Sequence, residues 1–172
     1  MCSSDLSTPH ACRQKIKEAL TIIMNGNQAD LQKFVADFRE EFLNLPFEQV
    51  AFPRGVKGMN KYSDKKEIYI KGTPIQVKGA LIFNSLLKSK NVKTIPPIMD
   101  GDKIKFAYLK LPNPIGETVI ATPDELPMEF KLDKYIDREL QFSKSFVEPL
   151  RSIAEVIDWE VEQKATLEDF FG

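Results

Sequence analysis

Residues 73–84, with the sequence TPIQVKGALIFN, constrain the fold of this chain more than any other stretch. Thr73 and Gln76 are spaced as a capping box, and Pro74 stands at a position where a helix needs no N–H donor. The stretch therefore predicts the start of a helix with a broad apolar side. Gly79 lies about one turn inside it, at a cost of about 1 kcal/mol relative to alanine. We interpret this glycine either as tolerated in a packed helix or as a point of close approach by another backbone, of protein or of polynucleotide.

The length and composition are those of a folded domain with a core of its own: 172 residues, 42% hydrophobic and 28% charged. No apolar run approaches the ~18 residues that span a bilayer, and we find no pattern of a secretory signal. Two cysteines, Cys2 and Cys12, are too few for a disulfide framework or a zinc site. We therefore expect a reduced chain inside the cell.

The net charge of −1 hides a strong asymmetry along the chain. Residues 54–110 contain 13 basic and 4 acidic side chains, whereas residues 1–53 contain 5 and 7, and residues 111–172 contain 6 and 14. This pattern predicts one polyanion-binding face on an otherwise acidic body. The alternative is an ordinary solvated surface that is rich in lysine.

Apolar residues at helical spacing predict two helices in the first part of the chain. The first begins after residues 7–9, STP, and ends at residues 25–27, NGN. The second runs from about Gln28 to Leu45, and Pro46 ends it. We expect an antiparallel pair whose phenylalanines face the core.

Short strands alternate with turns in the basic middle of the chain, and we predict them at residues 47–52, 67–70, 103–110 and 118–121. The loop at residues 53–58, PRGVKG, carries two glycines and the cations Arg54 and Lys57. Glycines allow backbone N–H groups to face an anion, so the loop is either a phosphate cradle or a solvated turn.

Two further residue pairs in this region are candidates for ligand binding. Lys61 and Tyr62 place a cation beside an aromatic hydroxyl, which suits contact with a nucleic-acid backbone. Asp100 and Asp102 are oxygen ligands at a spacing that can hold Mg²⁺. We favour the other interpretation, a polar turn around Gly101 between two strands.

Helical spacing of apolar residues returns from Lys131 to residue 158, with Pro149 as a kink or interruption. Trp159 and Val161 are expected to pack on the core. The whole chain is thus predicted to be α+β and mostly helical. It has a helical pair at residues 7–45, a small antiparallel β portion within the basic middle at residues 47–121, and C-terminal helices at residues 131–158.

The last seven residues carry an apolar stripe, because Leu167, Phe170 and Phe171 are spaced i, i+3, i+4. Two phenylalanines near a chain end suggest that they have a binding partner. We expect the stripe either to dock on the same domain or to enter a groove of another protein as a short helical peptide.

Taken in order, these segments resemble the thumb domain of family B DNA polymerases, and within that family the T-even-bacteriophage-like group. The similarity covers nearly the whole chain, from about Ser7 to Gly172. It rests on STP at 7–9, FREEF at 38–42, KY at 61–62, VKGAL with Asn84 at 77–84, GDKI at 101–104, NP at 113–114, KxFxxPL at 144–150 and the aromatic tail.

This resemblance implies a domain that grips primer–template duplex behind the polymerase active site, through phosphates rather than bases. It also implies that Leu167, Phe170 and Phe171 enter the pocket of a sliding clamp. Glu148 departs from the pattern, because relatives can have a lysine there, and a carboxylate repels phosphate. Together with the basic loop, the motifs predict DNA contacts by Arg54, Lys57, Lys61, Tyr62, Lys78, Gly79, Asn84 and Lys144.

The motifs of the polymerase palm, fingers and exonuclease are not found in this sequence. We therefore expect no cofactor in this chain and no polymerisation by it alone, with Mg²⁺ held by palm aspartates elsewhere. The expected partners are primer–template DNA, the sliding clamp, and the palm and fingers in the same or a separate chain. We expect no membrane partner and, for a viral protein, a location in the host cytoplasm.

The expected domain boundaries are a non-native or unstructured start at residues 1–6, a thumb domain at 7–165 and a clamp-binding tail at 166–172. The chain is then either a fragment of a longer polymerase or one subunit of a split one. Two other classes stay open. One is a stand-alone protein that also binds single strands through exposed aromatic side chains. The other is a scaffold whose basic face meets an acidic protein.

Overall fold

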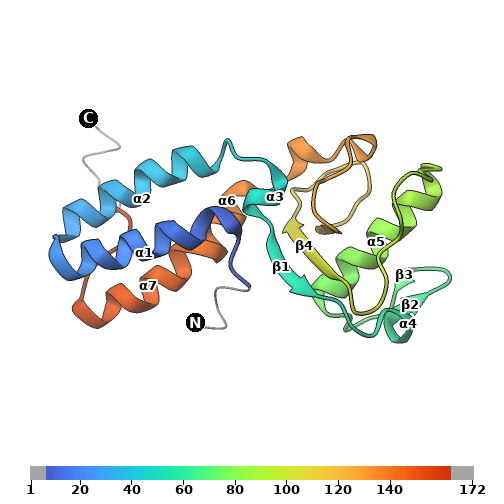
Figure 1. Cartoon of the computed structure of the whole chain (residues 1–172), viewed down its shortest axis with the longest axis horizontal. Coiled ribbons are helices and arrows are strands. Elements are labelled where there is room, and N and C mark those ends of the chain that lie inside the picture. Colours follow the sequence, from blue (N-terminus) through green and yellow to red (C-terminus); the bar gives the residue numbers. More distant parts are fainter. Residues whose placement is uncertain (1–6, 164–172) are drawn as a thin grey trace.

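The chain folds into two lobes, which lie at opposite ends of the elongated molecule in Figure 1. The computed structural model describes residues 7–163, so residues 1–6 and the tail at 166–172 lie outside the described residues. We call residues 7–45 and 138–163 the helical lobe, and residues 46–137 the sheet lobe. No helix of the described residues is long and apolar enough to cross a membrane.

The helical lobe is built on the predicted antiparallel pair, α1 (His10–Asn25) and α2 (Gln28–Phe42). Asn27 caps α2, because its side chain accepts the N–H of Asp30 while the Asp30 carboxylate accepts the N–H of Asn27. The interpretation of the aromatic stripe as core is confirmed. Buried rings of the two helical segments meet edge to face between α2 and the C-terminal helices, at Phe38, Phe42, Phe142 and Phe146.

The C-terminal helical segment is interrupted near Pro149, as predicted. Proline has no N–H, so the carbonyl four residues earlier loses its helical donor. A π-helical stretch, Ser143–Val147, accordingly separates α6 (Arg138–Phe142) from α7 (Glu148–Ala154). Val161 is buried and Trp159 packs against the core, as expected.

The predicted helical start at Lys131 is wrong. Residues 128–135 form only short 3₁₀ turns, Met128–Phe130 and Asp133–Tyr135, and α6 begins seven residues later than expected. Two contacts explain the delay. Ile136 forms a β-bridge with Leu109, which holds the chain extended. Asp137 then caps α6 by accepting the N–H of Leu140.

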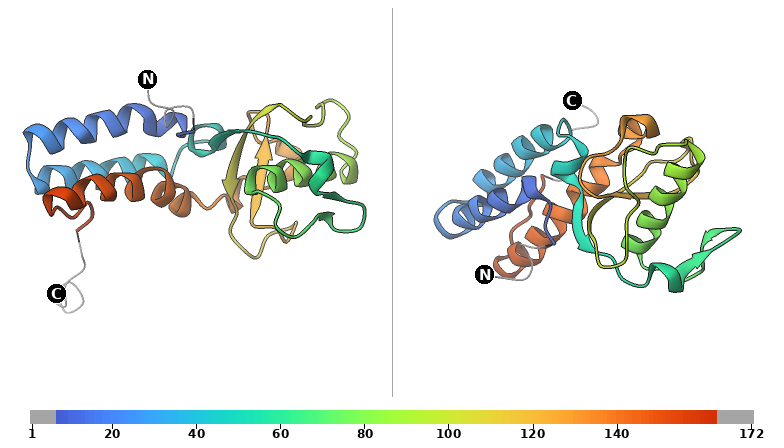
Figure 2. Two further views of the ribbon diagram at one scale, coloured as in Figure 1. Left: turned by 90° about the horizontal axis from the view of Figure 1, so that it is seen from below. Right: turned by 45° about the vertical axis from the view of Figure 1, so that its right-hand side comes forward.

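The sheet lobe contains an antiparallel sheet in the order β1 (Phe52–Gly55), β4 (Lys103–Tyr108) and β5 (Val119–Thr122). Helix α5 (Ile75–Ser89) packs along β5. Beyond it, α4 (Met59–Tyr62) leads into a hairpin of β2 (Ser63–Asp64) and β3 (Ile68–Tyr69), which projects from the lobe in Figure 2. The α+β class with a small antiparallel portion is confirmed.

Two local predictions in this lobe are wrong. The strand predicted at 47–52 begins only at Phe52, because α3 (Phe47–Val50) precedes it and buries Phe47 and Val50 on one side of a single helical turn. The capping box at the start of α5 does not form. The Thr73 hydroxyl donates instead to the carbonyl of Ile70, and Pro74 is the N-cap residue.

Candidate nucleic-acid interface

Most lysines of the sheet lobe are exposed, and within residues 7–163 almost none has an acidic partner. Lys105 is the exception in the basic segment, with its Nζ 2.7 Å from Asp124 Oδ1. The remaining cations of this segment have no carboxylate oxygen within 4 Å among the described residues. Those with exposed side chains are Lys57, Lys61, Lys65, Lys66, Lys71, Lys88, Lys90, Lys93, Lys103 and Lys110.

Aromatic rings hold several of the predicted contact residues in place. Lys61 Nζ lies 5.2 Å from the ring centroid of Tyr62, and Lys78 Nζ lies 4.8 Å from that of Tyr69. A cation over a ring face is attracted by the ring quadrupole without losing its charge. The ammonium groups are therefore oriented while they remain available to an external anion.

Tyr69 also ties the hairpin to the loop that precedes β5. Its hydroxyl donates to Glu117 Oε2 at 2.8 Å. Burial, followed by the hydrogen bond and negative charge of Glu117, raises the pKa of Tyr69 to about 12. The phenol therefore keeps its proton, and this hydrogen bond, until the pH is strongly alkaline.

The loop at residues 53–58, for which the sequence left open a phosphate cradle or a solvated turn, is tied to the turn at residues 100–102. Gly58 has φ = 84°, and the next N–H, that of Met59, donates to the Asp100 carboxylate at 2.9 Å. The N–H of Val56 donates to the carbonyl of Asp102 at 3.0 Å. These two donors are used inside the fold, and the Lys57 side chain is exposed.

Arg54 lies on β1 instead of in a loop. Its guanidinium donates to the carbonyls of Ser7 and Pro53, both at 2.9 Å. The same group lies 5.8 Å and 5.7 Å from the ring centroids of Phe52 and Phe106. Arg54 therefore joins the start of α1 to the sheet, at the boundary of the two lobes.

Gly79 and Asn84 have roles inside the protein. A Cβ at Gly79 would lie 2.9 Å from both the Cβ and the N of Ala121, so the close approach predicted for this glycine is made by β5. The Asn84 amide donates to the carbonyl of Ile98 and accepts its N–H, at 2.9 and 2.7 Å. The predicted DNA contacts therefore rest on the exposed cations.

The turn at residues 100–102 is confirmed as a turn. Gly101 has φ = 92°, and each carboxylate accepts a backbone N–H, from Met59 to Asp100 and from Met99 to Asp102. No cluster of three potential metal-ligating side chains occurs within residues 7–163.

Two adjoining hollows run along α5 and share Asn84 and Lys88. One, of about 620 Å³, lies against the hairpin and includes Lys65; the other, of about 480 Å³, includes Lys93. We call them together the α5 groove. Its one acidic lining residue, Asp64, accepts the N–H groups of Glu67 and Lys66, which lower its pKa. Lys65, Lys88 and Lys93 were not singled out from the sequence, because their shared groove depends on the tertiary fold.

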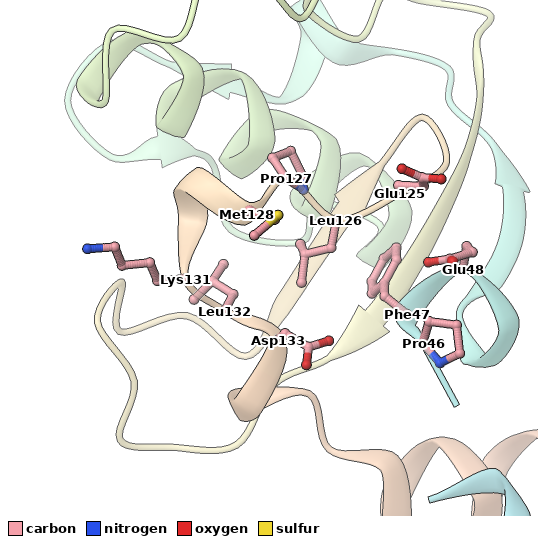
Figure 3. A pocket seen from close by; sticks show the side chains of 10 residues that line it. All are labelled: Pro46, Phe47, Glu48, Glu125, Leu126, Pro127, Met128, Lys131, Leu132 and Asp133. Carbon is pink, nitrogen blue, oxygen red and sulfur yellow. The ribbon is translucent and has the colours of Figure 1, made fainter. Parts of the chain in front are cut away.

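A pocket of about 330 Å³ near α3 has the opposite charge (Figure 3). Glu48, Glu125 and Asp133 line it, with Lys131 as its cation. An acidic pocket repels phosphate, so this surface is not part of the candidate interface.

The predicted contact residues thus fall into two groups. Lys61, Tyr62 and Lys78 lie around α4, the hairpin and α5, whereas Lys144 lies on the π-helical stretch with its Nζ 5.5 Å from the Tyr108 ring centroid. Lys144 and Arg54 line a common groove between the lobes. Glu148 is exposed near this second group. Leu167, Phe170 and Phe171 lie outside the described residues.

Comparison with known proteins supports the resemblance drawn from the motifs. The chain is 31% identical over 170 residues to the DNA-directed DNA polymerase of Enterobacteria phage T4. It is 27% identical over 169 residues to that of Escherichia phage RB69. The chain is similar to part of a T4-like DNA polymerase. Each match covers 96% of this chain but 18% of the polymerase, so the chain spans less than a fifth of these relatives. No protein-family model matches the chain.

Proposed function

We propose that this chain is the thumb part of a phage-type DNA polymerase and that it grips primer–template duplex through phosphates. The observation that carries the proposal is the set of exposed sheet-lobe lysines without carboxylate partners, in a chain similar to T4-like polymerases. Lys61, Lys65, Lys78, Lys88 and Lys93 surround the hairpin and the α5 groove. Each carries a compact ammonium charge, suited to a phosphate rather than a base edge.

The packing of α5 supports binding without sequence recognition. A helix that recognises bases must place one face in the major groove. In α5, buried residues face β5 and the core, including Val77, Gly79 and Phe83. Its Asn84 amide, a side chain that can recognise adenine, is occupied by Ile98. The contacts that remain are electrostatic, so affinity depends on salt and not on base sequence.

Fluorescence anisotropy of the chain with a labelled primer–template duplex tests this proposal. We expect similar affinities for unrelated sequences, weaker binding to single strands, and an affinity loss of roughly 10²–10³-fold between about 50 and 200 mM salt for about five phosphate contacts. Equal affinity for single strands indicates a general single-strand binder. A chain that binds no duplex even at low salt contradicts the proposal and favours the scaffold alternative.

We propose that the C-terminal tail docks on a sliding clamp. The support is the sequence pattern alone, in which Leu167, Phe170 and Phe171 form one apolar stripe. Deletion of residues 166–172 is expected to abolish association with the clamp while duplex affinity and melting temperature stay the same. A large fall in melting temperature would mean that the tail belongs to the core of this domain.

We propose that polymerisation chemistry, with its Mg²⁺, is supplied by parts of the polymerase outside this chain. The support is the extent of the similarity, which spans 18% of each relative. The purified chain with Mg²⁺ and nucleotides is expected not to extend a primer. Primer extension that persists after the chain is repurified contradicts the proposal that the polymerisation chemistry lies outside this chain.

A further inference from the structure

A second basic groove lies between the lobes, and it draws on the acidic N-terminal third of the sequence. The groove has a volume of about 570 Å³ and lies where α1 begins beside β1 and α7 (Figure 1). We call it the joint groove. Its lining includes four cations from three elements, Arg13, Lys17, Arg54 and Lys144, and no carboxylate.

These four cations have no ion-pair partner within the described residues. Arg13 uses its Nε to donate to the carbonyl of Thr8 at 3.2 Å, and Arg54 uses its Nη1 to donate to the carbonyls of Ser7 and Pro53. A guanidinium carries five N–H donors, so both retain donors for a further acceptor. Lys17 and Lys144 are exposed. The groove therefore gathers positive charge that the fold does not neutralise.

The start of α1 adds to this charge. Pro9 is its N-cap residue, no side chain caps it, and its first turn contains no acidic residue. The helix has 16 residues, so its N-terminal end carries a substantial partial positive charge. Because Thr8 and Pro9 line the groove, this end lies at its wall.

The joint groove also has apolar lining residues. They are Ile16, Leu20, Phe52, Pro149 and Ile153. A nucleic-acid strand matches this combination of cations and apolar groups, because deoxyribose alternates with phosphate along its edge. Free phosphate matches only the cations, so the apolar lining favours the sugar–phosphate chain.

We propose that the joint groove binds a second stretch of the duplex backbone, with Arg13 and Lys17 as additional phosphate contacts. This inference rests on the proposed function and extends it to the helical lobe. The DNA footprint then crosses from the α5 groove to the start of α1. The two added cations come from residues 1–53, whose net charge is negative, so the charge of that segment does not predict them.

The test compares duplex binding by the wild-type chain with that by Arg13→Gln/Lys17→Gln. The variant is expected to bind roughly 10- to 30-fold more weakly at ~0.15 M salt, with a salt dependence flatter by about two units of slope. Arg13→Lys, which keeps the charge, is expected to bind nearly as well as the wild type. Lys33→Gln/Arg39→Gln loses the same charge at two cations that are paired with Asp37 and Glu139, and is expected to change neither quantity. Melting temperatures confirm that each variant is folded.

The remaining outcomes separate this inference from the proposed function. If the wild type binds duplex and Arg13→Gln/Lys17→Gln binds it equally well, the joint groove holds no DNA, while the thumb proposal stands. If the wild type binds no duplex, both proposals are overturned. If Arg13→Gln/Lys17→Gln weakens the binding of polyglutamate but leaves duplex affinity unchanged, the groove binds an acidic protein partner instead. Inorganic phosphate that displaces duplex better than chloride at equal ionic strength indicates a free-phosphate site and overturns the inference.

Discussion

The helical lobe and the sheet lobe use their basic side chains differently. In the helical lobe, Lys15, Lys33, Arg39 and Arg151 each lie within 4 Å of a carboxylate, as in the pair of Arg39 with Glu139. In the basic segment of the sheet lobe, Lys105 alone has such a partner among the described residues. Exposed ion pairs add little stability, but they neutralise the local field. Unpaired charge therefore marks the surface that is available to an external anion.

Three cations of the helical lobe are exceptions. Arg13, Lys17 and Lys144 have no carboxylate partner within residues 7–163, and all three line the joint groove. They lie at the end of the lobe that adjoins the sheet lobe, in the same groove as Arg54 of β1. In both lobes, therefore, cations paired with a carboxylate differ from unpaired cations, which are available to an external anion.

The largest expected effect is on the stability of the helical lobe. Phe38→Ala removes a buried ring whose centroid lies 4.9 Å from that of Phe146 and 5.7 Å from that of Phe142. Such a truncation costs about 3–5 kcal/mol of unfolding free energy. Urea denaturation measures this loss. The exposed Lys61→Gln is the control, expected within about 0.5 kcal/mol of the wild type. A loss below about 1 kcal/mol for Phe38→Ala contradicts the assigned core.

A smaller effect is expected where α5 meets the sheet. Gly79→Ala gains up to about 1 kcal/mol of helix propensity, but its Cβ would lie 2.9 Å from Ala121. Overpacking against β5 is expected to outweigh this gain and to lower stability by about 1–3 kcal/mol. Gly55→Ala is the matched control, because no heavy atom lies within 4 Å of its added Cβ. A Gly79→Ala protein as stable as the Gly55→Ala protein means that α5 stands further from β5.

The third expected effect is on binding rather than on stability. Lys78→Glu places a carboxylate beside the DNA and is expected to weaken duplex binding about tenfold for all sequences, with a salt slope flatter by about one unit. Anisotropy titrations at several salt concentrations measure both quantities. Lys33→Glu makes the same charge change at a cation paired with Asp37, and is expected to leave duplex affinity unchanged. A loss that differs between sequences points to base recognition.

The smallest expected effect concerns pH. Because the folded pKa of Tyr69 is raised to about 12 from 10.0, the unfolded chain releases this proton first. The resulting stabilisation is complete below pH ~10 and is lost as pH rises towards 12. Tyr69→Phe is expected to remove this part of the alkaline loss and to cost about 0.5–1.5 kcal/mol at neutral pH through the lost hydrogen bond. Tyr135→Phe, at another half-buried tyrosine, serves as the control. If stability falls with rising alkaline pH in Tyr69→Phe as it does in the wild type, Tyr69 is not the group responsible.

Local patterns predicted the elements whose signals lie within one segment. The α1–α2 pair followed from apolar spacing, and the break near Pro149 followed from the missing N–H. The helix at Phe47 was missed because a single turn leaves too few residues to distinguish periods of 2 and 3.6.

The candidate site was less predictable, because its key contacts join distant segments. The Asp100 carboxylate accepts the N–H of Met59, directly after the loop at residues 53–58, and no local pattern connects the two. Of the two interpretations of Gly79, the structure supports close approach by a protein backbone, but the partner, Ala121, is distant in the sequence. Arg13 and Lys17 belong to an acidic segment, and only the tertiary fold brings them into one groove with Arg54 and Lys144.

The most direct test of the central claim compares the salt dependence of duplex binding in two triple variants. Lys61→Gln/Lys65→Gln/Lys88→Gln removes three unpaired cations of the sheet lobe, whereas Lys33→Gln/Arg39→Gln/Arg151→Gln removes three paired cations of the helical lobe. We predict a slope flatter by about three units for the first variant and the wild-type slope for the second. Equal changes in both variants would contradict the claim that unpaired charge marks the DNA-binding surface.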